Sequence, residues 1–299
     1  MDYIIGYDIG GTKCAASIGA VEEKITLLGR YEVPTTKDPI ETLSRLEEQT
    51  RAWIAAYPVS AIGVSCGGPL DSKKGQLYQV ANLPGWDNFK IVEYLEQKFE
   101  KKTYLQNDAN ACALVEWKFG AGKGCRNMVF ITMGTGLGAG LILDGKLYCG
   151  TNDNAGEVGH IRLAEDGPLG FGKKGSFEGF CGGNGIARLA ERMGGKPGVT
   201  TKELAMAAKA GDAFAKSVFE KSGEMLGRGL SVLIDVLNPE KIVIGGIFMR
   251  SGELLIPSME RVLKEECISF SLGVCKVLPA ALSENVGDYA AISCALQNS

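Results

Sequence analysis

The sequence is poor in the residues that build metal clusters and disulfide frameworks. It contains a single histidine, and no two of its nine cysteines have Cys-x-x-Cys spacing. An odd number of scattered cysteines is typical of reduced thiols inside a cell. We therefore expect neither a disulfide framework nor a cysteine-rich zinc site.

An excess of basic residues and long apolar runs are also missing. The formal net charge of −3 offers no basic surface to nucleic acid or to an anionic membrane. No apolar run is long enough to span a bilayer, and the first residues lack the positive region of a signal peptide. We predict a cytoplasmic protein that binds neither membranes nor nucleic acid.

No Pro- or Ser-rich linker divides the 299 residues, although this length suggests two domains. Glycine, in contrast, is abundant, and its 41 copies gather at the ends of predicted elements, where a backbone must approach something closely. The runs are 10–11, 67–68, 134–140, 182–185 and 245–246. We expect two halves that pack directly on each other.

Hydrophobic periodicity predicts that both halves begin with a strand, a glycine turn and a second strand. The predicted strands are 3–9, 14–18, 24–33, 61–66, 103–106, 128–133, 139–143, 146–148, 242–244 and 274–278. The predicted helices are 43–57, 91–99, 111–119, 180–193, 213–237, 253–266 and 286–296. The repeated opening indicates a duplication, with a cleft between the two halves.

The two glycine turns, within 8–13 and 132–138, are the first chemical signals. Successive N–H groups in such a turn converge on one anion and can hold phosphate. A dinucleotide fingerprint needs a helix after its glycines, but a strand is predicted here, and no Walker motif occurs. Each turn alone could be a simple glycine hairpin. Two turns that both carry Thr, with Asp8 in the first, favour phosphate with Mg²⁺ between acid and anion.

Several motifs together resemble the ROK family of sugar kinases, within the superfamily of actin, hexokinase and Hsp70 ATPases. The resemblance covers nearly the whole chain. Its motifs are 8–13, 82–86, 107–110, 116 with 119–122, 134–136, 156–160 and 245–246. It implies an α/β fold of two ribonuclease-H-like, actin-like ATPase domains with a cleft between them. The expected domains are 1–115 plus 286–299, and 116–285.

The resemblance assigns roles to individual residues. Asp108 resembles the general base that accepts the proton of the sugar hydroxyl, and Asp8 resembles the acid that orients Mg²⁺ through water. The residues that resemble sugar ligands are Gly68, Asn82, Asn107, Glu157, His160 and Glu178. Those that resemble ATP ligands, besides Asp8, are Gly10, Gly11, Thr12, Lys13, Thr132, Gly134, Thr135, Gly136, Gly245 and Gly246.

Structural alternatives stay open for three of these side chains. Asp108 could be the N-cap of the helix that follows it. His160 could be a structural histidine, and Glu178 could be an exposed acid at the start of helix 180–193. Phosphoryl transfer itself needs a carboxylate near the attacking hydroxyl, which favours a catalytic Asp108.

One segment departs from the family pattern. Most ROK members carry CxCGxxGCxE after the histidine, and its three cysteines bind zinc with that histidine. Leu169, Phe171 and Ser176 occupy those positions here. His160 alone cannot supply three or four zinc ligands, so we predict that zinc is absent. We expect Leu169 and Phe171 to pack where the metal would lie.

The sequence thus predicts an ATP- and Mg²⁺-dependent kinase of a hexose or N-acetylhexosamine, in a homodimer as is usual for such kinases. A repressor would need a DNA-reading module, for which the sequence leaves no room before residue 3. An ATPase that acts on proteins would not need the pair Glu157 and His160. A non-catalytic sugar-sensing protein of the same family is the remaining alternative. The residues do not specify the sugar.

Overall fold

The computed structural model describes residues 1–282 and 286–297. The chain forms two compact units. Unit 1 contains Met1–Gly124, Gly140–Ala155 and the described residues from Leu282 onward, and unit 2 contains Cys125–Ala139 and Gly156–Ala281. The predicted domains differ in that 116–124 and 140–155 lie in unit 1. Their ends at 283–285 and 298–299 lie outside the described residues.

Unit 1 is built on a mixed sheet with the strand order β3-β2-β1-β4-β7. The strands are β1 (Asp2–Ile9), β2 (Lys13–Val21), β3 (Ile25–Pro34), β4 (Val59–Cys66) and β7 (Thr103–Asn107). The first three pair antiparallel, whereas β1, β4 and β7 run parallel. All five were predicted, because alternating apolar residues are typical of strands in such a sheet.

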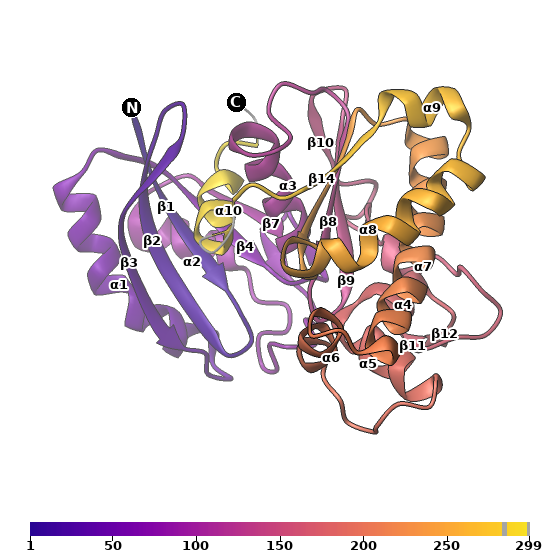
Figure 1. Cartoon of the computed structure of the whole chain (residues 1–299). Helices are drawn as coiled ribbons and strands as arrows, with labels where there is room; N and C mark the ends of the chain where they lie inside the picture. The colour runs from indigo at the N-terminus through magenta and orange to yellow at the C-terminus, as the bar shows by residue number, and fades with distance from the viewer. Residues whose placement is uncertain (283–285, 298–299) are drawn as a thin grey trace. The chain divides into compact units, whose positions relative to one another are not determined.

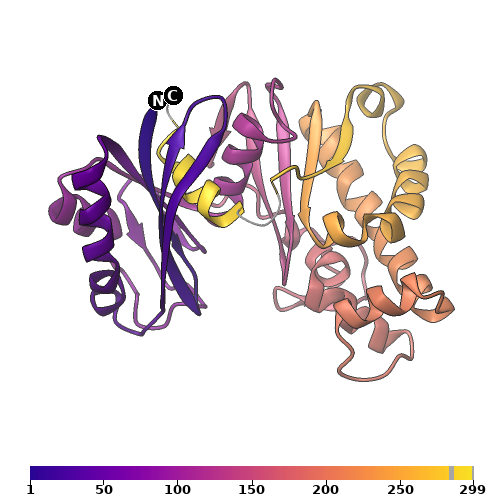
Figure 2. The same ribbon diagram turned by 60° about the vertical axis from the view of Figure 1, so that its left-hand side comes forward.

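Helices cover both faces of this sheet (Figures 1 and 2). They are α1 (Pro39–Ala56), α2 (Ile91–Phe99), α3 (Asp108–Phe119) and α10 (Val286–Cys294). On one face Ile5 and Tyr7 share a core with α1 and α2, and on the other Ile4 shares a core with α3 and α10. Successive side chains of a strand point to opposite faces, so β1 serves both cores.

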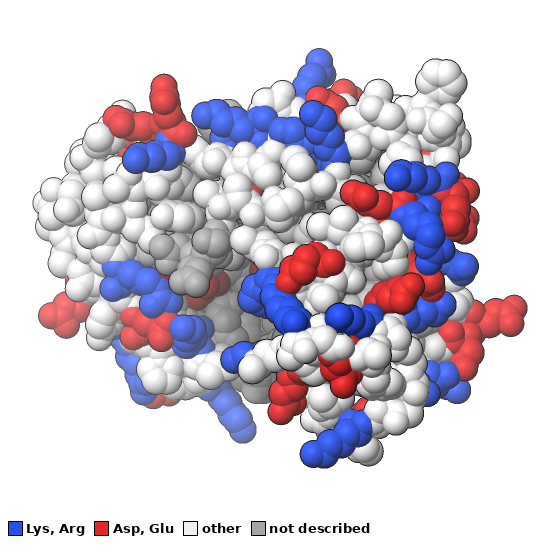
Figure 3. All heavy atoms as spheres, in the orientation of Figure 1, with Lys and Arg blue, Asp and Glu red and all other residues white. Residues whose placement is uncertain are grey.

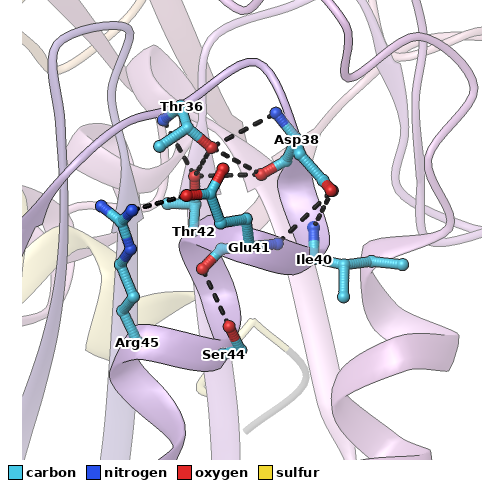
Figure 4. Close-up of polar contacts among 7 residues, drawn as sticks. All are labelled: Thr36, Asp38, Ile40, Glu41, Thr42, Ser44 and Arg45. Carbon is cyan, nitrogen blue, oxygen red and sulfur yellow. Dashed lines mark hydrogen bonds and ion pairs between the residues drawn. The ribbon is translucent and has the colours of Figure 1, made fainter.

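The start of α1 illustrates how the local sequence ends a loop and begins a helix. The Asp38 carboxylate accepts hydrogen bonds from the N–H groups of Ile40, at 2.8 Å, and Glu41, at 3.4 Å (Figure 4). The hydroxyls of Thr36 and Thr42 are within hydrogen-bonding distance of the Asp38 carbonyl. Asp at the N-cap followed by Pro satisfies or removes the N–H groups that a helix start leaves open.

The second sheet is also mixed and has the strand order β10-β9-β8-β13-β14. Its strands are β8 (Met128–Met133), β9 (Leu137–Leu143), β10 (Lys146–Tyr148), β13 (Lys241–Gly246) and β14 (Lys276–Pro279). Small hairpins are formed by β5 (Leu70–Asp71) with β6 (Gln76–Leu77), and by β11 (Leu169–Gly170) with β12 (Lys173–Lys174). Neither hairpin was predicted.

The helices of unit 2 differ from the prediction in several places. They are η1 (Val158–His160), α4 (Phe177–Cys181), α5 (Gly183–Arg192), α6 (Thr201–Lys209), α7 (Ala213–Leu237), α8 (Ile247–Glu266) and α9 (Ser269–Val274). The predicted helix 180–193 is interrupted, because Gly182 adopts extended angles and separates α4 from α5. The helix α8 begins six residues earlier than predicted and is kinked at Ser251. Both α6 and α9 were missed.

Charges of both signs share the molecular surface. The face in Figure 3 carries acidic and basic side chains side by side. Ion pairs such as Lys209–Glu253 and Arg261–Glu224 join them on unit 2. Among the residues that the structure describes, no helix combines the length and apolar character needed to cross a membrane.

Candidate functional site

Three parallel strands of unit 1 end at the same edge of their sheet. In the strand register Asp8 lies beside Ser65, and Cys66 lies beside Asn107. Asp8, Asn107 and the following Asp108 therefore come from neighbouring strand ends. Ligands of open α/β sheets bind outside the carboxyl ends of the strands. The predicted acid for Mg²⁺ and the predicted base thus share one edge.

The helix α3 begins at this edge, and its N-cap is Asn107. The Asn107 Oδ1 atom accepts a 2.7 Å hydrogen bond from the N–H of Asn110. The alternative that Asp108 is the cap is therefore wrong, since Asp108 is the first helical residue. With Oδ1 engaged, the Nδ2 group is the part of Asn107 that can donate to a ligand.

The Asp108 carboxylate is accessible to solvent and is little used by the fold. Its Oδ1 atom accepts a hydrogen bond of 2.8 Å from the adjacent N–H of Ala109. Although Asp108 is exposed, nearby protein atoms displace part of the water around its carboxylate and raise its pKa, while backbone hydrogen bonds act in the opposite direction. A carboxylate with a raised pKa is a stronger base, which suits proton transfer.

Asp8 lies among charges of both signs. Burial is the main cause that raises its pKa to about 6, and the negative charges of Asp288 and Asp108 add to it. The Arg30 Nε atom donates to both oxygens of Asp288, at 3.2 and 3.0 Å. Its positive charge lowers the pKa of Asp8. A side chain at Gly287 would collide with the Asp8 carboxylate, so glycine there lets α10 approach.

The first glycine turn joins β1 to β2 and lies against a predicted sugar ligand. The Gly10 N–H donates to the Lys13 carbonyl at 3.1 Å. A Cβ atom at Gly11 would lie 2.5 Å from the Asn82 carbonyl oxygen, so the missing side chain admits Asn82. The Lys13 ammonium pairs with Glu32 at 2.8 Å. A Cβ atom at Gly68 would have open space around it, so crowding does not explain why glycine occupies this position.

The single carboxylate at Asp8 suits Mg²⁺ that is bound together with substrate phosphates better than it suits a cation bound only by protein side chains. Mg²⁺ keeps several waters and is held by one or two carboxylates together with substrate phosphates. Among the described residues, no group of three or more His, Cys, Asp and Glu side chains could hold a metal ion. One half-buried carboxylate beside a glycine turn agrees with a cation that arrives with a nucleotide.

The second glycine turn, in unit 2, is fixed by hydrogen bonds to its carbonyl oxygens. The Gly183 N–H donates to the Gly134 carbonyl at 2.8 Å, and the Asn184 N–H donates to the Thr135 carbonyl at 3.1 Å. The start of α5 therefore holds the turn. The strand register also places Gly245 beside Thr132 and Gly246 beside Met133. These predicted ATP-binding segments lie together at one sheet edge.

Glu178 lies behind this turn. Its Oε2 atom accepts a 3.1 Å hydrogen bond from the Leu137 N–H, and a side chain at Gly136 would collide with its carboxylate. The residue is half-buried in the first turn of α4, whose N-cap is Ser176. The alternative of an exposed acid at the start of helix 180–193 is therefore wrong.

A pocket of about 1040 Å³ opens beside the second turn within unit 2. Helices α5 and α6, the start of α8 and the loop before α6 surround it. Its lining includes Gly134, Thr135, Asn184, Arg188, Lys202 and Ile247. Gly246 has a φ of 70° and precedes α8, so the Gly245–Gly246 segment leads directly into this lining.

Glu157 precedes the short helix η1 in the same unit, and His160 is the last residue of that helix. The His160 N–H donates to the Glu157 carbonyl at 3.1 Å. The imidazole stacks on Phe171, with 3.8 Å between ring centroids and 25° between ring planes. Phe171 therefore packs on the imidazole of His160, which agrees with the expected packing of this residue. The expectation is wrong for Leu169, which is 47% exposed.

We expect purified protein to contain no stoichiometric zinc and to lose no stability when a chelator is added. The physical reason is that Leu169 and Phe171 have no metal-binding atom. The hydroxyl of Ser176 is only a weak zinc ligand, and it caps α4. Elemental analysis and thermal unfolding with and without EDTA check this expectation. About one zinc ion per chain would contradict it.

Comparison with known proteins decides the family. A model of the ROK family matches residues 4–298. The chain belongs to the ROK family. The glucokinase of Streptomyces coelicolor is 30% identical over 305 residues, which cover 96% of this chain and 95% of that protein.

Two solved ROK structures are similar over the full length. The ROK hexokinase of Thermus thermophilus has a TM-score of 0.83 at 30% identity, covering 99% of this chain and 98% of that one. A ROK glucokinase of Streptomyces griseus, in complex with glucose and AMPPNP, has a TM-score of 0.78 at 30% identity, covering 99% and 100%. The predicted family and the predicted two-domain, actin-like ATPase fold are confirmed.

Two features of this ROK chain could not be predicted from its sequence. The charges of Asp288 and Arg30 shift the pKa of Asp8, although Asp288 lies 280 positions and Arg30 lies 22 positions from it in the sequence. The pocket beside Gly134 is built from helices whose mutual packing no local motif encodes. The one sequence signal for the charges around Asp8 was Asp288, an acidic residue near the start of the predicted helix 286–296.

Proposed function

We propose that this chain transfers the γ-phosphoryl group of ATP to a hydroxyl of a hexose, with Asp108 as the general base. The observation that carries the proposal is Asp108 itself: an accessible carboxylate at the carboxyl end of parallel strands, with a raised pKa. Relatives named glucokinase and hexokinase bear out the predicted class of enzyme, an ATP-dependent sugar kinase.

The nucleotide is assigned to the glycine turns and to the pocket of unit 2. Gly134, Thr135 and Gly136 face its phosphates, as do Gly10, Gly11 and Thr12 of the first turn. The pocket at Gly245 and Gly246 receives the adenosine part. When bound with the nucleotide, Mg²⁺ would neutralise charge on the phosphates. Asp8 would hold the ion through water.

The sugar is assigned to side chains that both donate and accept hydrogen bonds. In unit 1, Asn107 offers its Nδ2 group, and Asn82 lies beside the first turn. In unit 2, Glu157 and His160 contact sugar hydroxyls. Glu178 has one oxygen engaged with Leu137, so only its Oε1 atom is assigned to the sugar. Gly68 contributes backbone alone.

Asp108 performs the proton step of the reaction. As the sugar oxygen forms its bond to the γ-phosphorus, the bond from that phosphorus to the β,γ-bridging oxygen breaks, and ADP leaves with the electron pair. The hydroxyl proton passes to the Asp108 carboxylate, whose raised pKa favours its acceptance. Positioning and electrostatic stabilisation supply the remaining rate enhancement.

A coupled ADP-release assay tests the proposed function. Purified protein with ATP and Mg²⁺ is offered glucose first, because several relatives are named glucokinase, and then a panel of hexoses and N-acetylhexosamines. We expect sugar-dependent ADP release that requires ATP. Calorimetric sugar binding without any turnover would contradict a kinase and support a non-catalytic sugar sensor. The predicted homodimer is tested by sedimentation of the same preparation.

We expect the affinity for Mg²⁺–AMPPNP to fall as the pH drops through about 6. Asp8 has its pKa raised to about 6, mainly by burial, so it becomes neutral below that pH and loses its attraction for the cation. Asp8→Asn is neutral at every pH and serves as the control, because the nucleotide's own protonation affects both proteins. Calorimetry from pH 5 to 8 measures the difference. Parallel pH profiles for the two proteins would contradict the role of Asp8.

A further inference from the structure

The stacked pair of His160 and Phe171 joins a predicted sugar ligand to an aromatic ring of a neighbouring hairpin. The two rings are nearly parallel, at 3.8 Å between centroids. His160 ends η1, and Phe171 lies in the two-residue turn between β11 and β12. Within the described residues, neither ring nitrogen of His160 has a protein hydrogen-bond partner, so both nitrogens are available to a ligand.

The backbone at Phe171 is unfavourable for an aromatic residue. Phe171 has a φ of 51° and Gly172 a φ of 73°, as in the hairpin turns that normally carry Asn-Gly. A left-handed conformation is unusual for a bulky side chain and persists only when the surroundings impose it. Phe171 is also 43% exposed, so burial stabilises it only in part. Hairpin stability alone does not explain this residue.

The surroundings bring the ring over His160. A Cβ atom at Gly159 would lie 2.7 Å from the Phe171 Cε2 atom, so glycine leaves room for the ring. The chain on either side is fixed: the Phe177 N–H donates to the Ile161 carbonyl, and the Leu163 N–H donates to the Gly175 carbonyl, both at 2.8 Å. The hairpin is thus tied to the segment that carries His160.

We propose that Phe171 is a positioning residue for sugar binding: its ring holds the imidazole of His160 in the orientation that presents a nitrogen to a sugar hydroxyl. This inference rests on the proposed function, in which His160 contacts the sugar. A ring stacked on one face restricts both side-chain torsions of the histidine but leaves its nitrogen edge open. Orientation is then set before the sugar arrives, which lowers the cost of binding.

The variant Phe171→Asn separates this role from hairpin stability. Asparagine tolerates the left-handed conformation better than phenylalanine, so the thermal unfolding midpoint should stay the same or rise. The KM for glucose should increase about 2- to 10-fold, the range that the loss of one aromatic pair corresponds to. If another sugar of the ADP-release panel gives the highest kcat/KM, these measurements use that sugar instead of glucose. The kcat and the ATP KM should stay within about twofold.

Two further variants complete the comparison. Phe171→Tyr keeps the ring and should retain the wild-type glucose KM. Phe270→Asn removes an aromatic side chain that is 89% exposed elsewhere in unit 2 and should change neither KM nor kcat. In a His160→Ala background, Phe171→Asn should have no additional effect on the glucose KM, because the ring then has no imidazole to orient.

Nuclear magnetic resonance tests the contact independently of catalysis. Because the chain has one histidine, its imidazole gives one Hε1 signal. Ring current from Phe171 should displace that signal, Phe171→Asn should abolish the displacement, and Phe171→Tyr should keep it. An unchanged signal in Phe171→Asn would overturn the inference. So would an unchanged glucose KM in Phe171→Asn while His160→Ala raises it. If His160→Ala leaves the glucose KM unchanged, the assigned role of His160 fails, and this inference fails with it.

Discussion

The Asp108→Asn variant is expected to lose a factor of roughly 10²–10⁴ in kcat, the range for removal of a general base. Asparagine keeps the shape of the side chain but has no basic oxygen for the hydroxyl proton. Folding should be preserved, because the N-cap of α3 is Asn107 and Asp108 makes only a local hydrogen bond to Ala109. Affinities for sugar and nucleotide should also survive.

The measurement is kcat beside calorimetric affinities for glucose and AMPPNP. Asp38→Asn is the matched control, since it makes the same chemical change at an N-cap where Asn is as good as Asp, and its kcat should stay within about twofold. Asn107→Ala should in turn destabilise the protein by about 1 kcal/mol through loss of the cap. An Asp108→Asn enzyme within a few-fold of wild type would mean that another group accepts the proton.

The His160→Ala variant is expected to raise the KM for sugar far more than the KM for ATP. Leaving a bound sugar hydroxyl without its hydrogen-bond partner weakens sugar binding by roughly 1–3 kcal/mol, which corresponds to about a 5- to 150-fold increase in the sugar KM. The nucleotide is assigned to other residues, so its KM should change little. Steady-state kinetics with each substrate varied in turn separates the two effects.

His160→Gln provides the comparison for this variant, because glutamine still donates and accepts hydrogen bonds. It should recover part of the lost sugar affinity. Equal increases of both KM values in His160→Ala, accompanied by a lower unfolding temperature, would instead indicate that the imidazole supports the fold around η1.

Local pattern was sufficient for the strands and for most helices that position the site. The two glycine turns and the strands that flank them lie where periodicity predicted. The failures occurred where glycine or short segments interrupt a pattern. Gly182 breaks a helix because it adopts extended angles, and α9 is a single short segment with no buried residue to provide a periodic signal.

The site could be predicted one residue at a time, but not its internal arrangement. A motif indicates that Asp108 and Asn107 are polar residues at a strand end. It does not say which of them caps the helix, because both are good caps and the choice depends on backbone angles. The effect of Asp288 on Asp8 depends on how α10 packs against β1, and long-range packing of this kind leaves no local trace.

That packing also has a consequence for biosynthesis. The helix α10 lies against the first sheet so closely that side chains at Gly6 and Gly63 would collide with it. Translation produces β1 long before α10, which covers this face together with α3. Until then Ile4 lacks the part of its cover that α10 provides, and the surroundings of Asp8 are incomplete. We therefore expect nascent or truncated chains that lack residues 286–294 to bind chaperones through this face, although most of the sheet is already synthesised.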